Sequence, residues 1–218
     1  MGKPAPLPRA YELARKILGP DFITPQELAS ARGVGQPKRN QLERYEEEMP
    51  SDVEVLERYK ASNAMCLPLP LKPKSIMTIR ELGTDFFATK HWSWYAMQSQ
   101  TFSYETMVGS TGSPWLALMM APLPQSFNRT EKEQGALLKP LGVMPTAVEV
   151  VWGLAVYKWV RGKLLLPDAS VRTSCKASNK EERVCVGNTA SGIDIRPRKD
   201  NEVLYNLGAL AKIELVQT

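Results

Sequence analysis

The stretch that decides the fold is PTAVEVVWGLAVYKWVR, residues 145–161, the most clearly helical segment of the chain. Thr146 can cap a helix, and Glu149 falls in its first turn, where the helix dipole favours a carboxylate. Apolar side chains, Val151 and Trp152 among them, occupy most of the helix circumference. Because a helix this apolar packs on more than one side, we expect residues 145–161 to be the central helix of the fold.

The sequence after this helix is typical of β-strands. Strands are predicted at residues 163–166, 171–176, 182–187, 192–196, 202–205 and 209–216, the second and third forming a hairpin. Upstream, the apolar run 115–120 predicts a central strand, and a capping box of Thr130 and Glu133 predicts a helix at 130–138. We therefore expect an α+β fold, in which an antiparallel sheet packs with one face on the central helix.

Residues 1–62 are predicted to form a helical N-terminal segment. Helices are expected at 10–18, 25–33, 38–48 and 51–60, with Val53, Leu56 and Tyr59 pointing inward in the last of them. Thr24, Pro25 and Glu27 together give the second helix a strong start signal. Since the proline-rich stretch 67–73 predicts a stiff connector, we divide the chain into a helical segment, 1–62, and an α+β main domain, 63–218. The two can also form one continuous domain.

The spacing of Ala29 and Gly33 also fits the first helix and turn of a helix-turn-helix motif. The helix that would read DNA then carries four glutamates between residues 43 and 48, which face phosphates with the wrong sign. Arg39 falls where that motif needs an apolar anchor. We therefore favour a helical cap packed on the main domain over a DNA-reading module.

The composition is that of an ordinary globular protein, with 218 residues of which 43% are hydrophobic and 23% charged. The net charge is +5, and residues 158–199 alone hold ten basic and four acidic side chains. A basic patch attracts phosphate or an acidic protein partner. The candidate nucleic-acid-binding residues, on the predicted strands or just after one of them, are Arg172, Lys176, Arg183, Arg196, Arg198 and Lys199.

The predicted hairpin admits two registers. In one, Cys175 lies opposite Cys185, close enough for a disulfide. In the other, shifted by one residue, Cys175 lies opposite Val184, and the valines gather on one face with Arg172 and Arg183 on the other. Burial of the valines favours the shifted register. It predicts a buried, reduced Cys175 and a more exposed, free Cys185.

Cysteine usage and hydropathy predict a cytoplasmic protein without membrane association. The three cysteines are odd in number and show no CxxC spacing, which argues against a disulfide framework and against zinc. The N-terminus lacks the apolar core of a secretory signal. The longest apolar stretch, 147–160, is short for a membrane span and contains Glu149 and Lys158.

Few of the residue sets that catalysis uses are present. His91 is the single histidine, so multi-histidine metal sites are excluded by count, and neither GxxxxGK[ST] nor GxGxxG occurs. The aromatic residues around Trp92 and Trp94 can stack bases, but such a stripe is more often core, and the glycine-rich loop 109–113 lacks a lysine in register for phosphate. Glu149 is the carboxylate most open to desolvation. We predict no catalytic residue, metal or cofactor.

Short segments spread over nearly the whole chain carry a resemblance. They are DFITP (21–25), IREL (79–82), WY (94–95), WLAL (115–118), PTAVEVVW (145–152), Tyr157, VRG (160–162), VRTS (171–174) and RVCVG (183–187). In this order they resemble a group of uncharacterised bacterial proteins of about this length, many from uncultured lineages. The resemblance implies a bacterial, cytoplasmic protein built as one unit, and it implies no activity.

These observations favour a non-enzymatic binding protein with a basic C-terminal β face, for which nucleic acid is the expected ligand. One alternative is a structural or protein-interaction protein of a mobile element. A second is a carboxylate-dependent enzyme, which would need a deep pocket with a perturbed carboxylate. The oligomeric state stays open.

Overall fold

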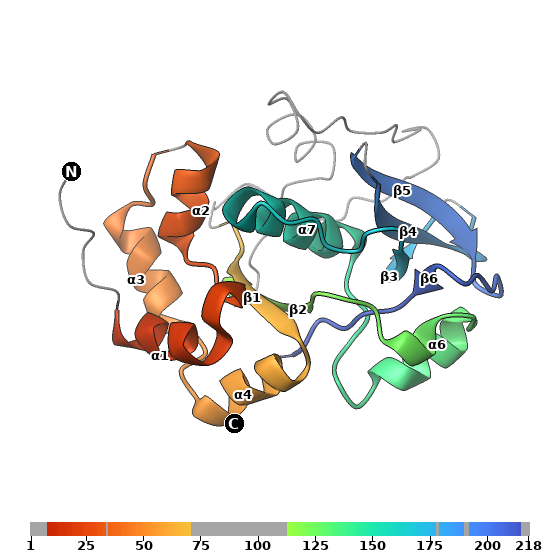
Figure 1. Ribbon diagram of the computed structural model, residues 1–218, viewed down its shortest axis with the longest axis horizontal. Coiled ribbons are helices and arrows are strands. Elements are labelled where there is room, and N and C mark those ends of the chain that lie inside the picture. Colours follow the sequence, from red (N-terminus) through yellow and green to blue (C-terminus); the bar gives the residue numbers. More distant parts are fainter. Residues whose placement is uncertain (1–7, 34, 71–112, 178, 190–191, 215–218) are drawn as a thin grey trace.

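The computed structural model describes residues 8–33, 35–70, 113–177, 179–189 and 192–214. Its α-helices are α1 (Arg9–Leu18), α2 (Pro25–Arg32), α3 (Arg39–Glu47), α4 (Val53–Ala61), α6 (Glu131–Leu138) and α7 (Ala147–Arg161). The N-terminal helices lie at one end of the molecule, the larger sheet lies at the other, and α7 runs between them (Figure 1). The predicted α+β fold with a helical N-terminal segment is confirmed.

The strands form two sheets. Strands β1 (Ala64–Pro68) and β2 (Trp115–Met119) form an antiparallel pair. The other sheet contains β3 (Ser170–Lys176), β4 (Glu182–Thr189), β5 (Gly192–Lys199) and β6 (Leu207–Gly208) in the order β5-β4-β3-β6. Strands β3, β4 and β5 pair antiparallel as predicted, whereas the two residues of β6 run parallel to β3.

Strand β2 is central in the interior, as its apolar sequence predicts. All five of its residues are buried, β1 pairs with one edge, and the extended backbone after β6 bonds to the other edge. There Met119 N donates to Ala211 O at 3.0 Å, and Ile213 N donates to Ala117 O at 2.9 Å. The buried strand thus has backbone partners on both sides.

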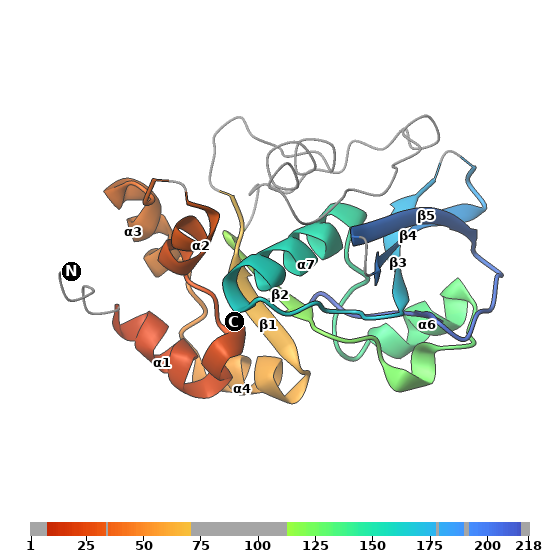
Figure 2. The ribbon, with the colours of Figure 1, turned by 45° about the horizontal axis from the view of Figure 1, so that its top comes forward.

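The central helix α7 begins and ends where its sequence predicts. Thr146 and Glu149 form a capping box, in which Thr146 N donates to the Glu149 carboxylate at 2.7 Å. Gly162 ends the helix with a left-handed φ of 71°. The helix contacts β2, β3, β4 and α2, and Figure 2 shows it between the N-terminal helices and the sheet. Contact on several sides explains why nearly its whole circumference is apolar.

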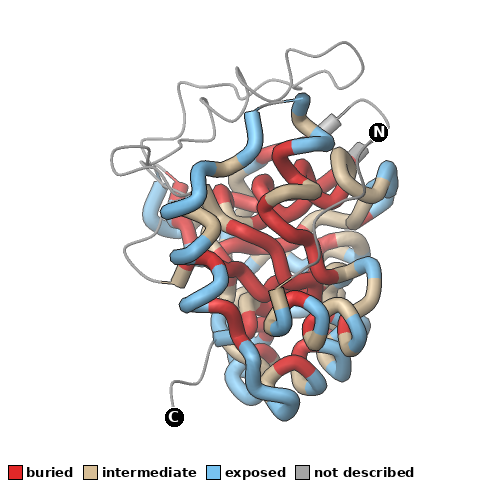
Figure 3. The backbone as a smooth tube through the Cα atoms, turned by 90° about the vertical axis from the view of Figure 1, so that its left-hand side faces the viewer, coloured by how far each residue is buried: buried red, intermediate tan, exposed pale blue. Residues whose placement is uncertain are grey.

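The N-terminal helices share a hydrophobic core with the rest of the described chain. Leu28 and Leu56 are buried, and Leu13 and Ile17 are half-buried against the same core. In Figure 3, which looks onto this end of the molecule, buried backbone runs through the interior and exposed turns surround it. The division after residue 62 stays a prediction.

In α4 the expectation for one side chain was wrong. Leu56 and Tyr59 point inward as predicted, but Val53 is 53% exposed. The first turn of α4 begins at Asp52, whose carboxylate accepts from Glu54 N at 2.7 Å, so the cap is one residue later than the expected Ser51. Val53 therefore lies in the first turn, at the rim of the packed face.

Three predicted strands are absent from the described part of the chain, and two unpredicted strands, β1 and β6, are present. Residues 163–166 and 202–205 do not pair as strands, and of the predicted strand 209–216 the described residues 209–214 make only isolated bridges, at Lys212. The first of these segments turns sharply, because Leu166 and Asp168 have left-handed φ values of 55° and 59°. Conversely, the expected connector begins inside β1, whose last residue, Pro68, pairs with Trp115. The expected helix from Ser75, the aromatic strand, His91 and most of the loop 109–113 lie outside the described residues.

The β3–β4 hairpin combines two registers. Lys176 lies opposite Arg183, as the shifted register predicts, but after an irregularity Arg172 lies opposite Cys185. The ladder is interrupted where Ser174 N donates to Pro145 O at 2.8 Å, next to the start of α7, instead of to β4. Because the two registers differ by two residues, each side chain stays on its predicted face.

The cysteine predictions were half right. All three cysteines are free, and Cys175 is buried as expected, with its Sγ accepting from Ala147 N at 3.3 Å. Cys185 was expected to be more exposed, but it is only 3% exposed. The prediction was wrong because both faces of the sheet are covered, by α7 on one side and by other segments on the side of Cys185. Burial raises the pKa of the Cys185 thiol to about 12.

Candidate nucleic-acid interface

The structure brings five of the six predicted basic residues onto one face of the larger sheet. Arg172 and Arg196 lie on either side of Cys185, while Lys176 and Arg198 lie on either side of Arg183. Directly paired residues share a face. Lys199 lies opposite Glu182 and so, by alternation along β5, belongs to the other face. This basic face is the side of the sheet that does not contact α7.

Arg172 does not reach the surface. Its side chain is fully buried, and its Nη1 donates to Gln134 Oε1 of α6 at 2.9 Å and to Arg129 O at 3.1 Å. Its Nη2 donates to the carbonyl oxygens of Lys199 and Glu202. Burial lowers the pKa of the guanidinium from its ordinary value. Arg172 therefore ties β3 to α6 and to the segment after β5, and it offers no surface charge.

Lys176 and Arg183 are neutralised by carboxylates of the same chain. Arg183 pairs with Glu131 of α6 at 2.6 Å and with Asp200 at 3.5 Å, and its side chain is only 17% exposed. Lys176 pairs with Asp200 from the opposite side. These contacts fasten α6 and the turn after β5 over the centre of the basic face.

Arg196, Arg198 and Lys199 of β5 remain accessible at the edge of the sheet. Arg196 and Lys199 are exposed, and Arg198 is partly exposed. Arg196 Nε lies 2.7 Å from Asp194 Oδ1, and Arg198 Nη1 lies 3.2 Å from Glu202 Oε1. Ion pairs this exposed contribute about 0–1 kcal/mol, so an incoming anion can displace them at little cost.

A hollow of about 330 Å³ lies beside these arginines, and we call it the polar hollow. The chain before β3, the far end of β4, the exposed side of β5 and the segment 204–207 enclose it. The polar and aromatic residues that line it include Asp168, Asn188, Asp194, Arg196, Arg198 and Tyr205. The ring of Tyr205 is 80% exposed, the largest exposure among the large apolar residues that the structure describes.

Two residues that line the polar hollow have polar groups without a partner among the described residues: Asp168, which is exposed to solvent, and Asn188, which is buried. Asp168 is exposed with a left-handed φ of 59°, and no hydrogen bond or ion pair joins its carboxylate to any residue in the described ranges. Asn188 is 3% exposed; its Nδ2 donates to Leu165 O at 3.0 Å, and its buried Oδ1 has no partner there either. Buried polar atoms without partners are uncommon and deserve a functional explanation.

Sequence analysis did not identify Tyr205, Asp168 or Asn188. Tyr205 was assigned to a strand, whereas it belongs to the turn that returns the chain from β5 to β6. The signal that could have identified this turn is the polar run Lys199-Asp200-Asn201-Glu202. Nothing in the local sequence of Asp168 indicates that it lies near β5.

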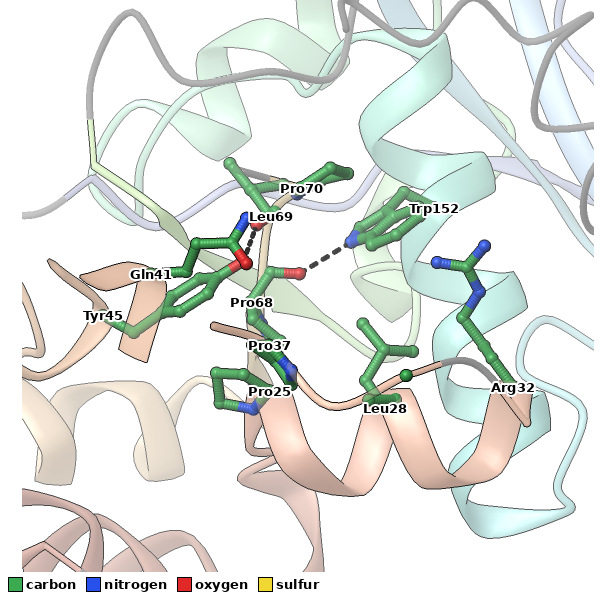
Figure 4. A pocket seen from close by; sticks show the side chains of 12 residues that line it. Pro25, Leu28, Arg32, Pro37, Gln41, Tyr45, Pro68, Leu69, Pro70 and Trp152 are labelled. Carbon is green, nitrogen blue, oxygen red and sulfur yellow. Dashed lines mark hydrogen bonds between the residues drawn. The ribbon is translucent and has the colours of Figure 1, made fainter. Parts of the chain in front are cut away.

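A second hollow, of about 200 Å³, is apolar and lies between α2, α3, the end of β1 and α7 (Figure 4). Trp152 Nε1 donates to Pro68 O at 3.0 Å, and Tyr45 OH donates to Leu69 O. Pro25, Leu28 and the prolines at the end of β1 supply most of its wall. We call it the apolar hollow.

Glu149, the carboxylate considered for catalysis, and the half-buried Glu27 both have structural partners. Glu149 closes the capping box of α7 and accepts from Lys212 Nζ at 2.9 Å. Glu27 lies between Arg15 and Arg161, and although burial opposes ionisation, hydrogen bonds from Thr24 N and Arg15 lower its pKa. No group of three or more metal-binding side chains occurs in the described part of the chain. None of the helices described there is both long and apolar enough to cross a membrane.

No family model, no curated protein and no solved structure matches the chain. The polar hollow and the residues around it are therefore the features from which we infer a function.

Proposed function

We propose that this protein binds single-stranded nucleic acid at the polar hollow and at the adjoining edge strand β5. The observation that carries the proposal is the position of Tyr205, an exposed aromatic residue that lines the same hollow as Arg196 and Arg198. An exposed aromatic ring beside cationic side chains is the arrangement by which proteins stack a base and hold its backbone phosphates. Lys199, at the end of β5, extends the cationic edge.

The ion pairs of β5 favour exchange for phosphate. Asp194 contacts one guanidinium nitrogen of Arg196, and Glu202 contacts one guanidinium nitrogen of Arg198. A phosphate can accept two parallel hydrogen bonds from one guanidinium, which is stronger than such a single contact. Lys176 and Arg183 are less suited to this exchange, because α6 and Asp200 enclose their charges.

The size of the hollow favours a single strand over a duplex. A volume of about 330 Å³ is at the lower end of small-ligand sites, which suits one nucleotide unit. A base can enter a concave site and stack on an aromatic ring only when it is unpaired, because a duplex keeps its bases stacked inside. We propose a bacterial, cytoplasmic location for this activity, in line with the three free cysteines.

Fluorescence anisotropy with a labelled single-stranded DNA oligomer of mixed sequence tests the proposal. The double variant Arg196→Gln/Arg198→Gln should lose roughly tenfold or more in affinity and should reduce the slope of log affinity against log salt by about 1–2. The matched control, Lys16→Gln/Lys60→Gln, removes the same charge from exposed positions on α1 and α4, at the other end of the molecule. Equal losses of affinity in both variants would contradict the polar hollow and β5 as the binding site. Binding of an acidic protein without binding of the oligomer would contradict nucleic acid as the ligand.

A further inference from the structure

We infer that the polar hollow prefers bases that carry an exocyclic amino group, with Asp168 as the residue that accepts from it. The inference rests on the proposed function and adds the class of base. Three carboxylates lie in or beside the hollow, and two are already paired: Asp194 with Arg196, and Glu202 with Arg198. Asp168 is the third, and its carboxylate has no partner among the described residues.

The position of Asp168 is fixed by its surroundings. It lies in the turn between α7 and β3, where Leu166 is buried and Pro167 bridges to Asn188 of β4. Ala169 N donates to Leu166 O at 3.3 Å, and Ser170 N donates to Asn206 O at 2.9 Å. The turn is therefore anchored on both sides, so the backbone position of Asp168 beside the hollow is defined.

The chemistry of a carboxylate gives the preference. An ionised carboxylate only accepts hydrogen bonds. Cytosine presents an amino group as a donor, and carboxylates accept from it in protein–DNA complexes. Thymine presents carbonyl oxygens at the corresponding edge. Their partial negative charge repels a carboxylate. With phosphates at Arg196 and Arg198 and the ring of Tyr205 as a stacking surface, Asp168 is the carboxylate of the hollow that no described residue pairs, and it is the acceptor we assign to the base edge.

The test compares oligo(dC) with oligo(dT) of equal length, which have the same charge and one ring per base. The wild-type protein should bind oligo(dC) roughly fivefold more tightly, the effect of about one net hydrogen bond. Asp168→Asn should bring the ratio of the two affinities close to one, because an amide both donates and accepts. Asparagine tolerates a left-handed φ as aspartate does, so this variant should fold, which circular dichroism checks.

Glu12→Gln is the matched control, because it removes one carboxylate from an exposed position on α1 and should leave the dC-to-dT ratio unchanged. Equal binding of the two oligomers by the wild-type protein would overturn the inference while leaving the proposed function in place. A preference that survives in Asp168→Asn would also overturn it. Absence of binding to either oligomer would overturn the proposed function and the inference together.

Discussion

Arg172 donates from Nη1 to Oε1 of Gln134 across 2.9 Å, and both side chains are fully buried between β3 and α6. Gln134 in turn donates from Nε2 to the carbonyl oxygens of Ser126 and Leu207. The pair therefore joins the sheet, α6 and the return to β6 through one chain of buried hydrogen bonds. The two terminal nitrogens of Arg172 have four acceptors between them, whereas its buried Nε has no partner among the described residues.

Arg172→Met should lower the free energy of unfolding by about 2–4 kcal/mol. The change keeps much of the side-chain volume but leaves Gln134 Oε1 and the carbonyl oxygens of Arg129 and Glu202 without the donor that Arg172 supplies. Arg196→Met, on the exposed edge of the same sheet, should cost at most about 1 kcal/mol. Urea denaturation of both variants measures this difference. Equal stability of the two would show that Arg172 is not structural.

Arg161→Met should loosen the N-terminal helices from α7. The Arg161 guanidinium donates to Pro20 O at 2.6 Å and Phe22 O at 2.9 Å, and it pairs with Glu27 at 3.0 Å. We expect a loss of about 2–3 kcal/mol and faster amide hydrogen exchange in α1 and α2. Lys158→Met, one turn earlier in the same helix, should leave exchange there unchanged. Slow exchange in Arg161→Met would contradict the role of Arg161 in holding these helices.

Asp168→Gly should stabilise the protein by about 0.5–1 kcal/mol, because glycine adopts a left-handed φ without steric cost. The same variant should lose the preference for oligo(dC), since it removes the carboxylate. Thermal unfolding and anisotropy on the same preparation measure both effects. A destabilised variant would show that the Asp168 side chain makes a stabilising contact.

Stability should fall as the pH rises above about 9. Burial raises the pKa of Cys185 and of Tyr157, each to about 12, and a hydrogen bond to Asp21 contributes to the rise at Tyr157. Both groups are neutral when protonated, so the unfolded chain ionises first, from about pH 8.5 for cysteine and about pH 10 for tyrosine. Their stabilising contribution is therefore complete below those values and is lost as the pH approaches 12.

Melting temperatures from pH 8 to pH 11 measure this fall, and a constant melting temperature would contradict it. A thiol reagent provides a second readout. At pH 8 it should react slowly with the native protein and rapidly with all three cysteines in guanidinium chloride.

The elements predicted correctly are those with local signals. Capping boxes at Thr24, Thr130 and Thr146 gave the starts of α2, α6 and α7, because the hydrogen bonds involved span only three residues. Strand β1 was missed because the prolines at its end obscured a buried strand. The burial of Arg172 could not be predicted, since its acceptors come from residues 27 to 43 positions away.

The candidate site was predictable only in part for the same reason. The cationic residues of β5 could be predicted from the sequence. The sequence did not show which of the six candidate basic residues bond to groups within the same chain. That depends on Glu131 and Asp200, which reach Arg183 from α6 and from the turn after β5. Tyr205 and Asp168 meet the same hollow from segments almost forty residues apart.

The affinity of Tyr205→Ala for a single-stranded oligo(dC), compared with that of Tyr205→Phe, tests the central claim most directly. The ring is 80% exposed and packs little in the free protein, so neither change should affect stability by more than about 0.5 kcal/mol. If a base stacks on this ring, Tyr205→Ala should weaken binding roughly tenfold or more, while Tyr205→Phe should keep most of the affinity. Unchanged affinity in Tyr205→Ala would contradict nucleic-acid binding at the polar hollow.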